Sequence, residues 1–91
     1  MDVGDQVKLL RPMLENEVGT IGYVYEEYPD FDEVGEFGVS VIFENGRYDG
    51  FSVWEQRHFL EYVKSVPQYQ NYLFRNVNEL HNDFKKNYWA F

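Results

Sequence analysis

The middle of the chain carries the clearest alternation of apolar and polar positions, and this alternation predicts a β-hairpin. Over residues 37–43 every second side chain is apolar, which is typical of a strand with one buried face. Asn45-Gly46 follows, and this dipeptide favours a two-residue hairpin turn because both of its positions accept a positive φ. We therefore expect a returning strand over residues 48–53, with Phe51 in the core.

Two further apolar runs predict strands before the hairpin. The first lies at residues 7–10 and ends before Pro12, because proline cannot donate to a sheet ladder. The second is a long strand at residues 18–28. Gly19 and Gly22 lie within it, and they predict a bend, a bulge or a close approach of two backbones.

A capping signature predicts a short helix directly after the hairpin. Ser52-Val53-Trp54-Glu55 fits the capping box S/T-x-x-E, so a helical turn should begin there. We expect it to run to about Arg57 or His58. Residues 59–63 can then extend as a fifth strand.

Apolar residues at helical spacing predict an amphipathic helix in the last part of the chain. Pro67 is expected to open it, because proline is tolerated in a first helical turn. The predicted second strand is apolar on both faces, so we expect this helix to pack on the outside of the sheet. The apolar stripe comprises Tyr69, Tyr72, Leu73, Val77, Leu80, Phe84 and Tyr88.

Residues 18–24, Val-Gly-Thr-Ile-Gly-Tyr-Val, resemble the second strand of KOW and Tudor-type small barrels. The resemblance covers residues 3–63 and implies an SH3-like barrel, in which four strands, a helical turn and a short fifth strand follow in order. The expected fold is therefore α+β and mainly β. A five-stranded SH3-like barrel (residues 1–64) would carry one amphipathic helix (residues 65–91) on its outside, within a single domain.

A second stretch, residues 43–52 together with 55–62, resembles a group of small bacterial proteins to which no activity is assigned. This resemblance therefore lends no catalytic or binding residues. KOW domains often contact RNA through basic loops, whereas the corresponding loops of this chain are acidic.

Charge is distributed unevenly along the chain. The formal net charge is −8, and residues 1–46 hold 11 acids and only two bases. No Lys or Arg occurs between Arg11 and Arg47. Such a surface repels nucleic-acid phosphates and favours cationic partners, so the sequence argues against nucleic acid and for a basic protein or peptide.

Targeting and membrane signals are not found in the sequence. The first residues have neither a basic start nor an apolar run, and no stretch approaches the ~18 apolar residues of a membrane span. We expect a cytoplasmic location and no membrane contact. The sequence leaves the oligomeric state open.

No group of residues in the sequence forms a recognisable catalytic or metal-binding pattern. The segment from Asp30 to Gly35 matches an EF-hand loop at positions 1, 3 and 6, but Val34 and Val41 occupy two ligand positions. His58 and His81 have no Ser or Cys partner in a nucleophile pattern, and structural roles are favoured for both. We therefore expect no enzyme activity, no metal and no cofactor.

The predicted binding surface combines an acidic loop with nearby aromatic side chains. In a small barrel, aromatic residues beside acids form grooves for proline-rich or cationic peptides. Trp89 and Phe91 either dock back onto the barrel or form a contact surface. The candidate binding residues are Tyr28, Asp30, Phe31, Asp32, Glu33, Glu36, Tyr48 and Trp54.

Three functional hypotheses follow from these patterns. The first is a non-catalytic interaction module that binds a basic protein or peptide. The second is an immunity or inhibitor protein that neutralises a cationic toxin or a nucleic-acid enzyme by charge mimicry. The third is a KOW-like nucleic-acid binder, against which the charge argues.

Overall fold

The computed structural model describes residues 1–30, 33–66 and 75–87. Several sequence-based predictions lie outside the described residues. These are the placements of Phe31, Asp32, Trp89 and Phe91, and the expected helix over residues 67–74.

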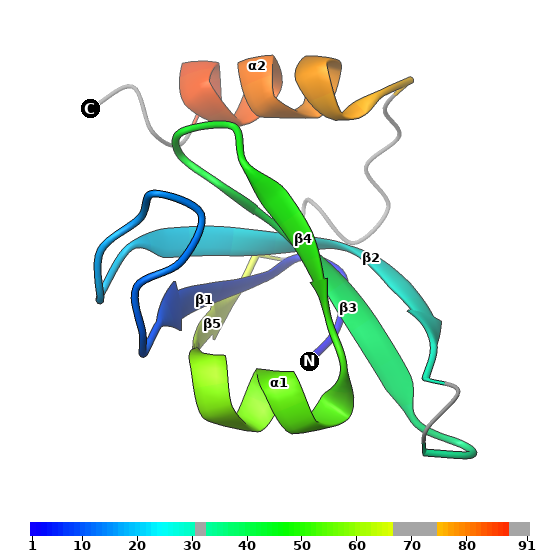
Figure 1. The fold of residues 1–91 in the computed structure, drawn as a ribbon. Helices are drawn as coiled ribbons and strands as arrows, with labels where there is room; N and C mark the ends of the chain where they lie inside the picture. Colours follow the sequence, from blue (N-terminus) through cyan, green and yellow to red (C-terminus); the bar gives the residue numbers. More distant parts are fainter. Residues whose placement is uncertain (31–32, 67–74, 88–91) are drawn as a thin grey trace.

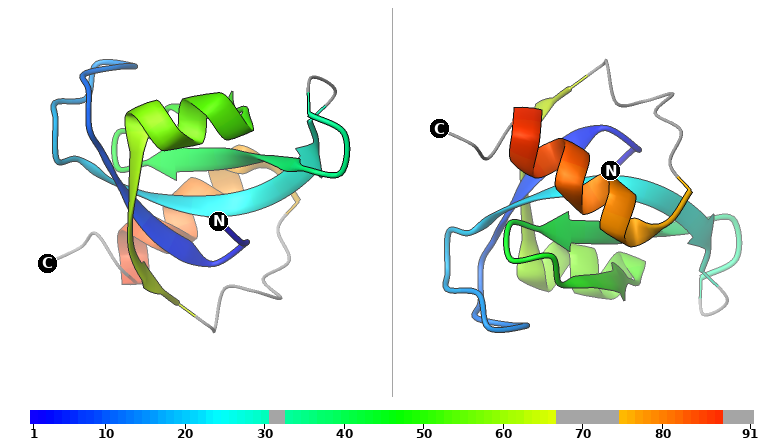
Figure 2. Two further views of the ribbon diagram at one scale, coloured as in Figure 1. Left: turned by 90° about the horizontal axis from the view of Figure 1, so that it is seen from below. Right: turned by 90° about the horizontal axis from the view of Figure 1, so that it is seen from above.

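The described chain forms one antiparallel five-stranded sheet with a helix on each side (Figures 1 and 2). The order of strands in the sheet is β4-β3-β2-β1-β5. The fold is therefore mainly β with two helices, as the sequence predicts. In chain order the elements are β1 (Asp5–Leu9), β2 (Ile21–Pro29), β3 (Phe37–Phe43), β4 (Tyr48–Phe51), α1 (Val53–Phe59), β5 (Leu60–Ser65) and α2 (Val77–Asn87).

The expected closure of the sheet into a barrel is wrong. Strands β4 and β5 are the two edges of the sheet, and no ladder joins them within the described residues. Strand β4 ends at Phe51 because Ser52 already caps α1, and α1 then leads directly into β5. The helix thus links the two edges that a closed barrel would pair.

The β3–β4 hairpin is confirmed, but its turn differs from the predicted two-residue type. Gly46 has φ +84°, while Asn45 is not among the residues with positive φ. The amide of Gly46 donates to the Phe43 carbonyl at 2.9 Å, and the amide of Phe43 donates to the Arg47 carbonyl at 2.9 Å. The loop therefore has three residues and ends in a glycine bulge. Asn45 Oδ1 stabilises it by accepting from the Arg47 amide at 3.0 Å.

The two predictions for the glycines of the second strand have different outcomes. At Gly22 side chains, rather than a second backbone, approach closely, because a Cβ there would lie 2.7 Å from Cγ1 of Val41. Gly19 has φ +89° and lies before β2, which begins at Ile21 rather than at residue 18. The bulge of this strand is elsewhere: the β2–β3 register shifts between Val24 and Glu26, so Tyr25 is the extra residue.

The sheet has an apolar core on each face. Val24, Val39 and Phe51 belong to the larger core, which lies on the α1 side of the sheet. Phe51 is only 1% exposed, which confirms its predicted place in the core. On the other face Tyr23 and Ile42 pack against α2. A sheet with two apolar faces needs a cover on each, which explains why a single layer of strands carries two helices.

Helix α2 packs on the outside of the sheet, as expected. Leu80 and Phe84 are buried there, and the rings of Phe84 and Tyr23 lie 5.0 Å apart. The start of the helix differs from the prediction. Residues 75 and 76 are not helical, and Asn76 Oδ1 caps α2 by accepting from the Glu79 amide at 2.9 Å.

The loop between β1 and β2 contains a strained tight turn. Met13 and Asn16 exchange both backbone hydrogen bonds, and between them Leu14 and Glu15 have φ values of +50° and +64°. Non-glycine residues in the left-handed region cost roughly 1–2 kcal/mol each. Asn45 helps to hold the turn, because its Nδ2 donates to the Leu14 carbonyl at 3.0 Å.

Replacing Glu15 by glycine should relieve part of this strain. Arg47 forms an exposed ion pair with Glu15, so the substitution is best made in an Arg47→Ala background that already lacks the pair. There we expect Glu15→Gly to raise the free energy of unfolding by about 0.5–1 kcal/mol in urea denaturation. The control Glu17→Gly, at a position without positive φ, should lower it. Equal effects of the two substitutions would contradict the strain at Glu15.

Candidate functional site

Three tyrosines lie on the sheet face that carries α2, and one of them, Tyr25, packs against the core beneath the helix. We call this surface the tyrosine face; it comprises Tyr25, Tyr28 and Tyr48. Tyr48 is paired with Ile42 and therefore shares its face, yet it is 53% exposed. The rings of Tyr25 and Tyr48 meet edge to face, with centroids 6.5 Å apart. The Tyr48 ring is therefore accessible to a partner, whereas Tyr25 and Tyr28 are half-buried.

The bulge in β2 places Tyr25 on this face together with its neighbour Glu26. Glu26 is paired with Ser40, and Ser40 donates to Glu26 Oε1 at 3.1 Å. Without an extra residue, consecutive positions would point to opposite faces of the sheet. The bulge therefore brings a phenol and a carboxylate side by side.

Two glycines leave space for the ring of the third tyrosine, Tyr28. Gly38 is paired with Tyr28, and Gly50 lies on the neighbouring strand. A Cβ at Gly38 would collide with the Tyr28 ring, and a Cβ at Gly50 would lie 2.8 Å from the Tyr28 hydroxyl. The ring therefore lies across the backbones of β3 and β4, where any larger residue would displace it.

Burial and nearby carboxylates raise the pKa of two phenols of the tyrosine face, those of Tyr25 and Tyr28. Burial raises the pKa of Tyr25 to about 12, the charge of Glu26 adds to the effect, and a hydrogen bond with Ser40 opposes it. Burial also raises the pKa of Tyr28. The further causes for Tyr28 are the charges of Glu55, Asp30, Asp49 and Glu26.

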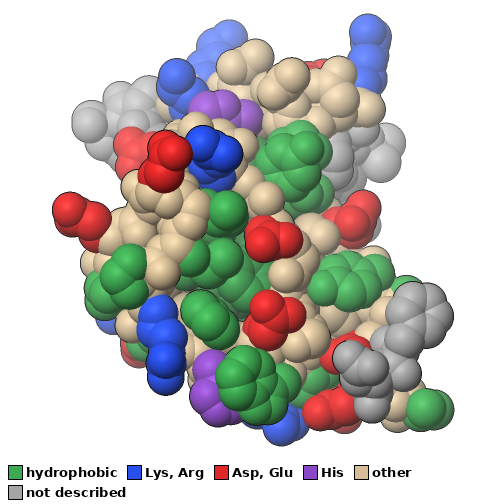
Figure 3. Space-filling model, in the orientation of Figure 1, with side chains coloured by type: hydrophobic (Ala, Val, Ile, Leu, Met, Phe, Trp, Pro, Cys, Tyr) green, Lys and Arg blue, Asp and Glu red, His purple; other side chains and the backbone are tan. Residues whose placement is uncertain are grey.

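The base nearest to this surface along the chain already has an acidic partner. Arg47 directly precedes Tyr48, but its guanidinium is paired with Glu15 at 3.0 Å. Figure 3 shows acidic side chains interspersed among hydrophobic and aromatic ones across the middle of the molecule. An acidic and aromatic surface of this kind suits a cation that can contact both a ring face and a carboxylate.

The structure separates the residues predicted to form one binding surface. Tyr28 and Tyr48 share the tyrosine face. Glu36 lies at a pocket on the opposite face of the sheet. Trp54 is 57% exposed on α1, where its ring stacks on His58 with centroids 3.9 Å apart. Glu33 is half-buried in the turn after β2.

Asp30 has a structural role. It is 9% exposed, and its Oδ2 accepts a hydrogen bond from the Val53 amide at 2.9 Å. Its backbone amide donates to the Glu36 carbonyl at 3.0 Å, which closes the acidic loop. This carboxylate therefore satisfies a free amide in the first turn of α1.

The sequence interpretation missed Tyr25, Glu26 and Asp49 as candidates for binding. The alternation of β2 indicates that Tyr25 and Tyr23 share a face, and the net charge indicates acids nearby. The bulge that also brings Glu26 onto this face has no signal in the sequence. Tyr48 lies beside Tyr25 because of the register between the strands. The identity of a single residue does not indicate this register.

Both histidines contact backbone carbonyl groups. His58 Nδ1 lies 2.7 Å from the Trp54 carbonyl, and His81 Nε2 lies 2.7 Å from the Glu44 carbonyl. These contacts agree with the structural roles expected from the sequence. Within the described ranges, no three His, Cys, Asp or Glu side chains are grouped so that they could hold a metal ion.

Comparisons with protein-family models, with curated proteins and with solved structures find no match to this chain. In the part of the chain that the structure describes, no helix is both long enough and apolar enough to cross a membrane.

Removal of the Asp30 carboxylate should destabilise the fold. We expect Asp30→Ala to lower the free energy of unfolding by about 1–2 kcal/mol, because the buried Val53 amide loses its acceptor. Asp30→Asn retains a carbonyl oxygen and should cost less. The control Glu36→Ala removes an exposed acid from the same loop and should change stability by less than ~0.5 kcal/mol. Equal stability of Asp30→Ala and wild type in urea denaturation would show that Asp30 does not brace α1.

Ionisation of Tyr25 should destabilise the fold at high pH. Above the ordinary tyrosine pKa of about 10 the unfolded chain loses this proton, while the folded chain keeps it until about pH 12. The stability that this phenol contributes is therefore complete below pH 10 and falls as the pH rises towards 12. We expect Tyr25→Phe to reduce that fall in urea denaturation, whereas Tyr62→Phe, at an exposed position, should not. An unchanged pH dependence in Tyr25→Phe would contradict the assignment.

Proposed function

We propose that the protein is a non-catalytic interaction module whose tyrosine face binds a basic segment of another protein. One observation carries the proposal: the exposed phenol of Tyr48, two half-buried tyrosines and the Glu26 carboxylate share a sheet face. The nearest base along the chain, Arg47, is already paired with Glu15. Partner cations would supply the missing charge.

The physical basis is a combination of ring and charge contacts. A Lys or Arg side chain over an aromatic ring contributes about 0.5–1 kcal/mol at exposed sites and about 2 when desolvated. The charges of Glu26 and Asp49 both act on the Tyr25 phenol. Glu26 lies on the tyrosine face, whereas Asp49 is paired with the core residue Val41 and lies at the edge strand β4. Several such contacts along an extended segment would add up to a measurable affinity, which salt would weaken.

The arrangement of strands supports a binding role. We infer that the sheet is an open member of the SH3-like class, because its strand order and the helical turn before β5 agree with that class. Small sheets of this type commonly recognise extended segments at aromatic surfaces. The acidic surface weighs against the KOW-like alternative, since binding to nucleic acid begins with neutralisation of phosphates.

An inhibitory role is the second candidate. It would use the same acidic surface to cover the cationic site of a toxin or a nucleic-acid enzyme. The net charge of −8 favours it. The identity of the captured partner separates the two roles: an inhibitor would retain one basic enzyme and abolish its activity.

The test is a comparative capture from cells of the source organism. The bait variant Tyr48→Ser/Asp49→Asn removes one ring and one charge, and the new amide oxygen can still accept from the Gly50 amide as the Asp49 carboxylate does at 2.8 Å. The control variant Glu61→Gln/Tyr62→Ser makes the same chemical change on β5, where Tyr62 is also 53% exposed. We expect a basic partner to bind the wild type and the control, and to bind the first variant at least about tenfold less.

The dependence on ionic strength provides an independent check. Affinity for the captured partner should fall as salt rises from about 0.05 to 0.5 M, because exposed charges are screened over this range. Equal capture by all three baits, or an affinity that salt leaves unchanged, would show that the tyrosine face is not the binding surface.

A further inference from the structure

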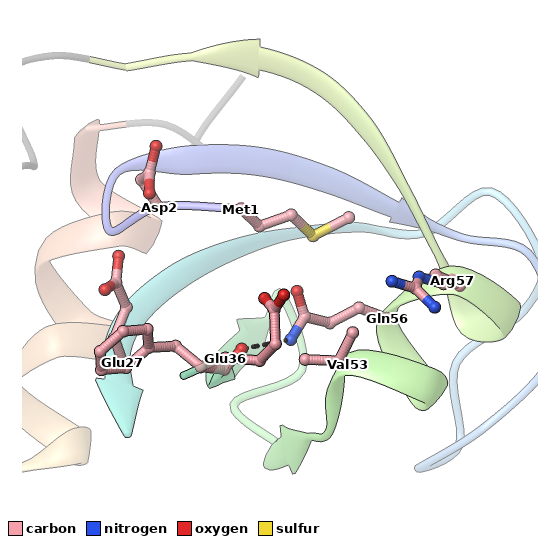
Figure 4. Close-up of a pocket in the computed structure, with 8 residues that line it drawn as sticks. Met1, Asp2, Glu27, Glu36, Val53, Gln56 and Arg57 are labelled. Atoms are coloured by element: carbon pink, nitrogen blue, oxygen red, sulfur yellow. Dashed lines mark hydrogen bonds between the residues drawn. The ribbon is translucent and has the colours of Figure 1, made fainter. Parts of the chain in front are cut away.

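A pocket of about 420 Å³ opens on the opposite side of the sheet from the tyrosine face, between the end of β2 and α1 (Figure 4). Glu27 faces this side, because it is paired with the core residue Val39, whereas the next residue, Tyr28, faces the other. The volume falls within the range of small-molecule sites, roughly 300–1,000 Å³. This pocket is therefore separate from the surface in the proposed function.

Gln56 supplies a buried acceptor at the base of the pocket. It is only 8% exposed, and its Nε2 donates to the carbonyls of Phe37 at 3.0 Å and Phe51 at 3.2 Å. These two acceptors fix the orientation of the amide, because only its nitrogen can donate. The oxygen Oε1 has no hydrogen-bond partner among the described residues, and Figure 4 shows it turned into the pocket towards Glu36 and Met1. A buried polar atom without a partner costs free energy unless water or a ligand satisfies it.

Carboxylates surround the same opening. Asp2, Glu27 and Glu36 line it, and none of them forms an ion pair within the described chain. Glu27 Oε1 accepts from the Val3 amide at 3.2 Å, which positions that carboxylate. Together with Gln56 Oε1, these groups accept hydrogen bonds and, in the ionised state, donate none.

Apolar side chains and the guanidinium of Arg57 complete the lining. Met1, Phe37 and Val53 form an apolar wall. Arg57 projects from α1 at the far end, away from Glu36 and Glu27 in Figure 4. A cation is therefore attracted to the carboxylate end and repelled from the Arg57 end, so the pocket has a defined polarity.

We infer that this pocket binds a guanidinium group carried on a short aliphatic stem. The planar guanidinium offers donors that can reach Gln56 Oε1 and the Glu36 carboxylate at once, whereas an ammonium is a point charge without this fork. The stem would lie against Phe37 and Val53. A free guanidine compound and an arginine side chain of a protein share this chemistry.

Binding can be measured by NMR with defined probes and the full chain. The probes are agmatine, Nα-acetyl-arginine amide and the peptide Gly-Gly-Arg-Gly-Gly, with Nα-acetyl-citrulline amide as the uncharged control. We expect saturable shifts of the Gln56 side-chain amide and of the Val53 and Arg57 backbone amides, with Kd near 1 mM, as suits a few contacts. Citrulline should produce no saturable shift.

Charge-matched variants separate the pocket from the overall negative charge. We expect Glu36→Gln and Glu27→Gln to weaken binding of the arginine probe by about three- to tenfold each. Glu33→Gln removes the same charge from the neighbouring loop, outside the pocket lining, and should leave Kd within a factor of about two. The variant Tyr48→Ser/Asp49→Asn should also bind normally, so failure of this inference is distinct from failure of the proposed function.

The outcomes of this experiment decide the inference and the source of the ligand. Tighter binding of agmatine than of the peptide would assign a free small molecule, and the reverse would assign an arginine of a protein; either supports the pocket. Shifts that do not saturate, that centre on Tyr48, or that are equal in Glu36→Gln and Glu33→Gln would overturn it.

Discussion

The first turn of α1 is the junction on which the open end of the sheet depends. Its free amides are satisfied from two directions: Ser52 Oγ accepts from the Glu55 amide at 3.2 Å, and Asp30 accepts from the Val53 amide. Gln56, one turn into the helix, then joins β3 to β4 by donating to a carbonyl of each strand end. The loop after β2, the hairpin and the helix are thus fixed to one another by a few polar contacts. The pocket borders this junction, and its geometry follows from it.

Local signals in the sequence predicted the elements better than their assembly. The capping box at Ser52 is present in both of its hydrogen bonds, and the hairpin ends at Gly46 as expected. These signals act within a few residues, so the surrounding fold cannot easily override them. Closure of the sheet and the start of α2 depend on contacts between distant segments, and both were predicted wrongly. The turn at Asn45 differs from the predicted type, and the Asn45 side chain bonds to Leu14 and Arg47 there.

For the candidate sites, the composition of the sequence indicated the kind of partner, but not which residues lie together. The surplus of acids and aromatic residues indicated a cationic partner, and Tyr28 and Tyr48 do share a surface. The sequence could not indicate that the Asp30 carboxylate accepts a hydrogen bond from the first turn of a helix. A buried and an exposed aspartate cannot be told apart from the residue type alone. Gln56 gave no signal at all, since its importance lies in two carbonyl groups that only the folded chain brings within reach.

The bulge at Tyr25 also has a consequence for how related sequences would differ. Glu26 and the residues after it are in register with β3 independently of Tyr25, which has no partner in the ladder. Loss of this one codon would leave the β2–β3 pairing on both sides intact while removing a ring from the tyrosine face. A lineage that dispensed with that surface could therefore do so by a single deletion inside a strand, where deletions are otherwise poorly tolerated because they invert every following side chain.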